Sequence, residues 1–200
     1  LTLSVDNQII HPTRCYGLSL KYGERWKSKT DIPFFYRDYD QLSADLLREV
    51  DNDYSKIREA IKAKFTQLDF SYMLDYLALE RLSYNSVNTD ICESFTASQT
   101  LGAIKPPTVQ VDGGEWIIDR DSRFFTDDIH YGLCIAKWIA ERMELNVPNI
   151  DKIIYWAQGL RSERILGSDL RLIEGANLVT TCKMGIPSVY GYRSVDEIIG

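Results

Sequence analysis

Two short segments, far apart in the sequence, hold the residues best suited to chemistry. His11 is one of only two histidines and stands in the run Asn7-Gln-Ile-Ile-His-Pro12. Because an imidazole exchanges protons near neutral pH, His11 is a candidate general acid and base. The same residue type also serves as an exposed or hydrogen-bonded loop histidine, so the local sequence leaves both roles open.

The second segment joins an arginine to a pair of acidic residues. Arg123 comes a few residues before Asp127 and Asp128. A guanidinium held by a turn at the mouth of a helix can clamp a substrate carboxylate through two hydrogen bonds. The acidic residues equally suit the start of a helix, where Thr126 or Asp127 would be the N-cap and the helix dipole favours negative charge. Local features therefore support either a substrate site or a helix start.

No metal site or reactive thiol is predicted. Metal binding by Asp127, Asp128 and His130 would need ligands from elsewhere in the chain. His130 lies two residues after Asp128, so on a helix the two side chains point to different faces and His130 is expected to be structural or at the rim. The cysteines show no paired spacing and no activating neighbours, and are predicted to be free thiols, mostly buried: Cys15, Cys92, Cys134 and Cys182.

Apolar residues at helical spacing predict that helices position these groups. Residues 1–36 are predicted to mix loop and short helix, because the proline in His11-Pro12 disfavours the helical conformation of the residue before it. One helix is predicted from Asp38 to Val50. A second follows the polar residues 51–53, with Asp53 as its N-cap.

The middle of the chain changes character. A third helix is predicted over Ser71–Tyr84, with Leu82 among its inward residues. Residues 108–119 then contain two short apolar runs around Asp112-Gly113-Gly114, which predicts a β-hairpin. This is the only β signal in the chain.

A long helix is predicted from Thr126 to Leu145, stopped by Pro148. On it, Lys137 is expected to be exposed. Asn149 or Asp151 could open the next helix. The expected fold is therefore mainly α: a compact helical domain over residues 1–200 with one small β-hairpin.

Composition narrows the class of protein. The chain is 44% hydrophobic and 26% charged, as in ordinary globular domains, and its net charge of −6 disfavours a nucleic-acid or anionic membrane surface. No apolar run reaches the roughly 20 residues that span a bilayer. The N-terminus has no basic residues followed by an apolar stretch, so a signal peptide is not expected. We expect a cytoplasmic location.

A dinucleotide-binding fold is not encoded in this sequence. The glycines form neither G-x-G-x-x-G nor a P-loop, and no alternating strand and helix pattern supplies a parallel sheet. We therefore expect a domain lacking the Rossmann fold. If the chain serves a nicotinamide enzyme, the cofactor fold lies elsewhere.

Three motifs follow one another along the chain: Asn7-Gln-Ile-Ile-His-Pro12, Arg123-Phe-Phe-Thr-Asp-Asp-Ile-His-Tyr-Gly-Leu133 and Pro148-Asn-Ile-Asp-Lys-Ile-Ile-Tyr-Trp-Ala-Gln158. In this order they resemble the C-terminal, helical domain of the octopine/opine dehydrogenase family. The two short motifs would be weak alone, but three in register make the resemblance fairly specific over essentially the whole chain.

The resemblance implies an enzyme that condenses an α-keto acid, typically pyruvate, with an amino acid and reduces the imine. His11 would be the acid and base, Asp128 its carboxylate partner, and Arg123 would bind a substrate carboxylate. NAD or NADP would be bound mainly by an N-terminal Rossmann domain. Such a histidine can both deliver and remove the proton that imine formation requires.

Two alternatives stay open. One is the helical domain of a related NAD(P)-dependent dehydrogenase that acts on a hydroxy acid, which would consume NADH without an amine. The other is a helical binding or dimerisation module without catalysis, in which replacing His11 or Asp128 would leave function untouched.

Overall fold

The computed structural model describes residues 3–98, 100–174 and 184–199. In chain order the elements are α1 (Asn7–Tyr22), the short 3-10 helix η1 (Lys29–Asp31), α2 (Gln41–Lys64), α3 (Tyr76–Tyr84), α4 (Ile91–Thr96), β1 (Thr108–Gln110), β2 (Trp116–Ile118), α5 (Arg123–Thr126), the π-helical segment η2 (Asp128–Leu133), α6 (Cys134–Arg142), α7 (Pro148–Arg161), the 3-10 helix η4 (Pro187–Tyr190) and α8 (Asp196–Ile199).

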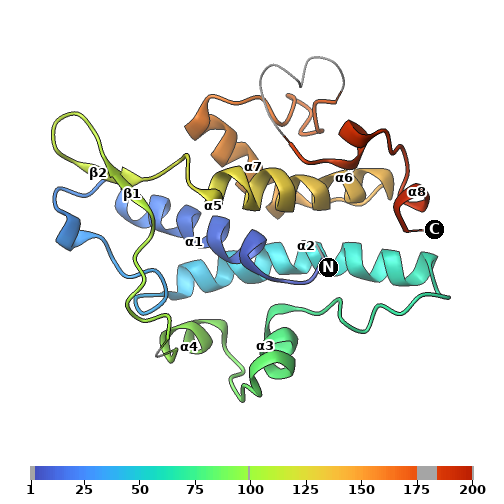
Figure 1. The fold of residues 1–200 in the computed structure, drawn as a ribbon, viewed down its shortest axis with the longest axis horizontal. Helices are drawn as coiled ribbons and strands as arrows, with labels where there is room; N and C mark the ends of the chain where they lie inside the picture. The colour runs from blue at the N-terminus through green and yellow to red at the C-terminus, as the bar shows by residue number, and fades with distance from the viewer. Residues whose placement is uncertain (1–2, 99, 175–183, 200) are drawn as a thin grey trace.

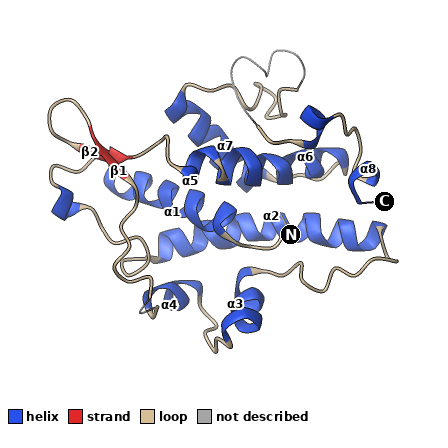
Figure 2. Cartoon of the chain, viewed as in Figure 1, coloured by secondary structure: helices blue, strands red, loops and turns tan. Residues whose placement is uncertain are grey.

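The prediction of a mainly α domain with one small hairpin is confirmed (Figures 1 and 2). The strands β1 and β2 pair antiparallel, with Val109 opposite Ile117, and they lie at one end of the helices. Among the described residues, no helix is long and apolar enough to cross a membrane.

Helix α1 is longer than the sequence predicted. His11 and Pro12 lie inside it, where loop and short helix were expected. Proline removes one helical hydrogen bond and disfavours the helical conformation of the residue before it. The helix nevertheless continues, because it packs along α2 and η2 and buries most residues around Pro12. Tertiary packing here outweighs the local preference.

Helix α2 runs without a break through residues 51–53, where two helices were predicted. Asp51 and Asp53 are both buried. The Asp51 carboxylate accepts hydrogen bonds from Arg58 Nη2 at 2.7 Å and from the backbone N–H of Tyr76 at 3.2 Å. Since the packed helix satisfies these polar groups, three polar residues in a row do not end it.

Asp53 caps a helix, but not the one predicted. Its Oδ2 accepts hydrogen bonds from the backbone N–H groups of Asn149 at 2.7 Å and Ile150 at 3.2 Å. These groups open α7, whose own N-cap residue, Val147, makes no side-chain cap bond. Helix α7 therefore begins at Pro148 with a cap supplied by α2, rather than by Asn149 or Asp151.

The long helix predicted over Thr126–Leu145 is divided in three. Helix α5 starts at Arg123 after Ser122, the π-helical segment η2 follows, and α6 ends at Arg142. Thr126 lies inside α5, and Asp127 precedes η2 without making a side-chain cap bond, so the predicted capping by Thr126 or Asp127 is not found. Short π-helical turns inside α-helices are rare and occur often at functional sites.

Two side chains were assigned to the wrong environment. Leu82 was expected to point inward, but it is 56% exposed. Lys137 was expected to be exposed, but it is buried and its Nζ lies 2.6 Å from Asp151 Oδ1 and 3.6 Å from Glu141 Oε1. Asp151 belongs to the next helix, so spacing along α6 could not reveal the pair that allows Lys137 to be buried.

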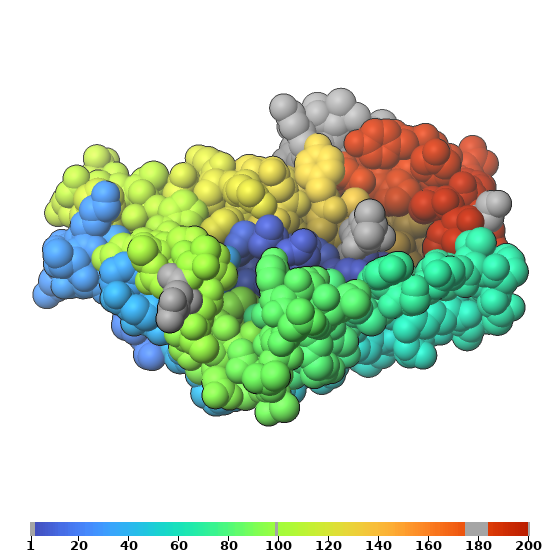
Figure 3. Space-filling view, turned by 60° about the horizontal axis from the view of Figure 1, so that its bottom comes forward, coloured from blue at the N-terminus to red at the C-terminus, as the bar shows by residue number. Residues whose placement is uncertain are grey.

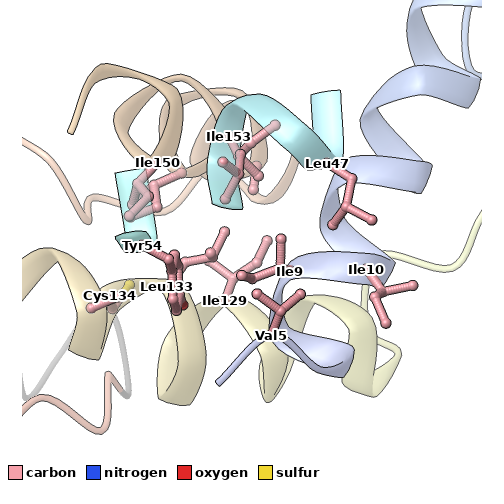
Figure 4. Packing of buried hydrophobic residues seen from close by; sticks show 14 of the residues in the cluster. Val5, Ile9, Ile10, Leu47, Tyr54, Ile129, Leu133, Cys134, Ile150 and Ile153 are labelled. Carbon is pink, nitrogen blue, oxygen red and sulfur yellow. The ribbon is translucent and has the colours of Figure 1, made fainter. Parts of the chain in front are cut away.

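The core joins α1 to η2. Figure 4 shows the side chains of α1 and of the segment before it meeting those of η2, with α2 and α7 closing the cluster. The labelled members are Val5, Ile9, Ile10, Leu47, Tyr54, Ile129, Leu133, Cys134, Ile150 and Ile153. This packing fixes the face of α1 that carries His11 against the segment that starts with Asp128.

The close approach of α1 and η2 depends on Gly132. A Cβ at this position would lie 2.3 Å from Gln8 Cβ. Gly159, in contrast, is an exposed residue of α7 whose added Cβ would meet nothing within 4 Å.

The same substitution at these glycines should therefore change stability in opposite directions. Gly132→Ala forces α1 and η2 apart and should lower the free energy of unfolding by about 1–3 kcal/mol. Gly159→Ala removes a flexible residue from a helix and should raise it by about 0.5–1 kcal/mol. Urea unfolding followed by circular dichroism measures both. A Gly132→Ala protein as stable as wild type would show that this contact adjusts without cost.

Candidate active site

His11 and Asp128 form a buried pair. The imidazole Nδ1 lies 2.8 Å from Asp128 Oδ2, and each residue is only about one-twentieth exposed, at 5% and 6%. The carboxylate fixes the tautomer of the neutral ring, because the Nδ1–H donates to it and leaves Nε2 as an acceptor. The two residues are 117 positions apart in the sequence, and the packing of α1 on η2 brings them together.

The rest of the imidazole is enclosed by aromatic side chains. The Tyr36 hydroxyl oxygen lies 3.1 Å from Nε2. Phe124 stacks on the ring with centroids 3.8 Å apart, and Phe35 meets it edge-on at 5.6 Å. Burial, together with the charge of Asp128, raises the pKa of Tyr36 to about 12, so its hydroxyl keeps its proton at neutral pH.

A buried arginine on the same helix holds Tyr36 in place. The guanidinium of Arg14 donates to the backbone oxygen of Phe35 at 3.0 Å and of Asp38 at 2.7 Å. These two carbonyls lie on either side of Tyr36 in the chain. Because Arg14 follows His11 by one turn of α1, its hydrogen bonds fix the segment that carries Tyr36 relative to the imidazole.

Arg123 differs from this buried arginine. It is exposed at the start of α5, and within the part of the chain that the structure describes its guanidinium makes no hydrogen bond or ion pair. Its positive charge acts on the Tyr36 hydroxyl and partly offsets the rise in the pKa of that group. The cation is therefore within electrostatic range of the Tyr36 hydroxyl, and it is available for an anion.

Figure 3 shows the face on which these elements meet. Residues of α1, in dark blue, lie in a recess of the surface. Yellow residues of the region from α5 to α6 border it on one side, and green residues of α3 and α4 border it on the other. The elements that carry His11 and Asp128 thus adjoin a hollow in the surface.

The remaining candidates take structural roles. His130 is buried and places its Nε2 2.9 Å from Glu163 Oε2, so of the two predicted positions, structural or at the rim, the rim is not the one found. Burial raises the pKa of the Cys15 thiol, which makes it a poor nucleophile.

The structure describes three of the cysteines, Cys15, Cys92 and Cys134, and all are free thiols, as predicted. Cys182 lies outside the described residues. Within residues 3–98, 100–174 and 184–199, no group of three or more histidine, cysteine or acidic residues could hold a metal ion.

The structure thus brings His11 and Asp128 into contact and gives the exposed Arg123 guanidinium no partner among the described residues. Sequence reasoning missed Tyr36, Phe124 and Arg14. Phe124 lies within the Arg123 motif and could have been included with it. Tyr36 is separated from both motifs, and only the fold shows that it meets His11.

The comparisons with known proteins agree with one another. Residues 1–161 match the family described as NAD/NADP octopine/nopaline dehydrogenase, alpha-helical domain. Tauropine dehydrogenase from Arabella iricolor is 27% identical over 208 residues, which cover 100% of this chain and 49% of that protein.

Solved structures of octopine dehydrogenase share the fold. One with NADH and L-arginine superposes with a TM-score of 0.78 at 26% identity, covering 96% of this chain and 46% of that one. Another, with NADH and pyruvate, gives a TM-score of 0.75 at 27% identity, covering 96% and 45%. The chain therefore spans about half the length of the relatives that it matches.

Proposed function

Because the chain belongs to the NAD/NADP octopine/nopaline dehydrogenase family, as its α-helical domain, we propose that residues 1–200 form the substrate-binding and catalytic half of an opine dehydrogenase. The proposed reaction joins the amino group of an amino acid to an α-keto acid such as pyruvate and reduces the imine. The observation that carries this proposal is the buried His11–Asp128 pair, together with an exposed Arg123 that has no ion pair or hydrogen bond to the described residues.

Each residue has a role that follows from its environment. His11 donates and accepts the proton that imine formation requires. Its Nε2 is the nitrogen that exchanges this proton, because Nδ1 is bound to Asp128. Asp128 fixes the tautomer and stabilises the imidazolium when it forms. Arg123 binds a substrate carboxylate and so orients the carbon that reacts.

The described residues do not fit a nicotinamide dinucleotide by themselves. They form one two-stranded antiparallel sheet and contain no glycine-rich turn between a strand and a helix. We propose that NADH or NADPH, which supplies hydride when bound, is held by an N-terminal Rossmann unit corresponding to the length of the relatives that this chain does not cover.

The test is oxidation of NADH or NADPH by the full-length protein with pyruvate and a panel of amino acids. We expect oxidation only when both the keto acid and an amino acid are present. Oxidation with a keto acid alone would instead indicate a hydroxy-acid dehydrogenase. No oxidation by a folded protein that binds the nucleotide would favour a module without catalysis.

Replacing Arg123 tests the carboxylate site. Arg123→Gln should raise the KM of the keto acid or of the amino acid by about 10- to 100-fold, because a charged hydrogen-bonded pair of about 1.5–3 kcal/mol is lost. Arg164 is also exposed and has no hydrogen bond or ion pair to the described residues, so Arg164→Gln is the matched control and should leave both KM values unchanged. Unchanged KM values for both substrates of Arg123→Gln would contradict the assignment.

A further inference from the structure

The only polar group that contacts His11 Nε2 in the described part of the chain is the Tyr36 hydroxyl, at 3.1 Å. Asp128 occupies the other ring nitrogen, and the phenyl rings of Phe124 and Phe35 cover a face and an edge of the imidazole. With His11 only 5% exposed, a substrate atom cannot reach Nε2 without displacing Tyr36 or exchanging a proton through it.

Tyr36 is held firmly, which argues against displacement. It is itself 7% exposed. Its ring packs edge-on against Phe35 with centroids 5.0 Å apart, and the tilted ring of Phe95 packs on it at 5.5 Å. The backbone on both sides of it is bonded to the buried guanidinium of Arg14. A hydroxyl fixed in this way is preorganised to transfer a proton.

The position of the hydroxyl also suits substrate. The carboxylates of Asp128 and Asp6 and the guanidinium of Arg123 act electrostatically on this hydroxyl, so the exposed cation lies within electrostatic range of it. A keto acid whose carboxylate is bound by Arg123 would therefore approach the Tyr36 hydroxyl, the one described polar group besides Asp128 that contacts the His11 ring.

We propose that Tyr36 is a catalytic residue, whose hydroxyl relays the proton between His11 Nε2 and the substrate. This inference rests on the proposed function. It deepens that function by naming the group that touches the reacting atoms during imine formation.

In the forward direction the relay acts on the carbinolamine formed from the keto acid and the amine. The Tyr36 hydroxyl proton passes to the hydroxyl of the carbinolamine while the His11 imidazolium returns its Nε2 proton to the Tyr36 oxygen. The carbon–oxygen bond breaks, water leaves with the bonding electron pair, and the nitrogen lone pair forms the C=N bond. Tyr36 is neutral before and after, His11 becomes neutral, and the positive charge passes to the iminium product.

The experiment compares Tyr36→Phe with wild type in the full-length protein. The variant keeps the ring and removes only the oxygen. We expect the single-turnover rate of amine-dependent nicotinamide oxidation to fall about 100-fold with little change in either KM, because binding is retained and proton transfer is not. The dependence of the rate on the fraction of D2O should be curved in wild type, where two protons move together, and linear in Tyr36→Phe.

Tyr39→Phe is the matched control. Tyr39 is equally buried, and its hydroxyl donates to the backbone oxygen of Ser43 at 3.4 Å instead of contacting His11. This variant should keep the wild-type rate and the curved D2O dependence. It also measures the change in melting temperature on removing a buried tyrosine oxygen.

Each result has one interpretation. A Tyr36→Phe rate equal to or above wild type would overturn the relay and show that Tyr36 merely covers His11. A loss that comes with a raised KM and a melting temperature well below that of Tyr39→Phe would also overturn it, in favour of a structural role. If wild type itself shows no amine-dependent oxidation, the proposed function fails and the relay fails with it.

Discussion

Replacing Asp128 with asparagine should lower kcat/KM for reductive condensation by about 10²- to 10⁴-fold in the full-length protein. Asparagine keeps the size of the side chain, but its amide can donate to His11 Nδ1 and so favour the tautomer that carries its proton on Nε2. The ring would then have lost both the acceptor that fixed it and the negative charge that stabilises its protonated form.

The neighbouring carboxylate provides the control. Asp127 is exposed and its Oδ1 accepts a hydrogen bond from the Thr126 hydroxyl at 2.9 Å, away from His11. Asp127→Asn should therefore keep kcat/KM close to wild type. The two variants differ by one position and remove the same charge, so a difference between them isolates the contact with the imidazole from the general loss of negative charge.

His11→Gln completes the comparison. If the pair acts as one unit, His11→Gln and the double variant with Asp128→Asn should lose about the same activity, because removing one member already disables the other. Additive losses would mean that the two residues act independently. Activity of His11→Gln near wild type would contradict the assignment of His11 as acid and base and favour the non-catalytic alternative.

Replacing Asp53 with alanine should lower the free energy of unfolding by about 3 kcal/mol. The Asp53 carboxylate is fully buried and accepts two backbone hydrogen bonds at the start of α7 as well as an ion pair from Lys56 Nζ at 2.7 Å. Its removal leaves those N–H groups without a cap in a buried position, which costs more than the loss of an exposed helix cap. For a domain of this size the melting temperature should fall by about 6–12 °C.

Asn52→Ala is the control for Asp53→Ala. Asn52 lies beside Asp53 on α2 but is exposed, so its replacement should change stability by less than about 0.5 kcal/mol. Thermal unfolding followed by circular dichroism compares both with wild type. Equal melting temperatures for the two variants would show that α7 is stable without the cap from α2. Should Asp53→Ala fail to fold, Asp53→Asn, which keeps one acceptor oxygen, should fold with an intermediate melting temperature.

The helical class of the domain, its single hairpin and its likeness to a known family were all readable in the sequence. Helical spacing of apolar residues marks one buried face whatever that face packs against, so the existence of most helices could be predicted. The hairpin was predictable because Asp112-Gly113-Gly114 is a local turn signal between two apolar runs. The candidate site residues His11, Asp128 and Arg123 could be named because their motifs are short and local.

Other features depended on partners distant in sequence. The sequence placed a break at residues 51–53 and a loop around Pro12 because local preferences favour them, whereas packing of α1, α2 and η2 outweighs both. It could not show that Asp53 caps α7, because that contact spans 96 residues.

The chemistry of the site was decided in the same way. The sequence supplied a histidine and a carboxylate, but only the packing of α1 on η2 sets Nδ1 against Asp128 and leaves Nε2 facing Tyr36. The residue types were determined locally. Their burial and hydrogen bonds were determined by tertiary contacts, because desolvation and hydrogen-bond geometry exist only once the helices have packed.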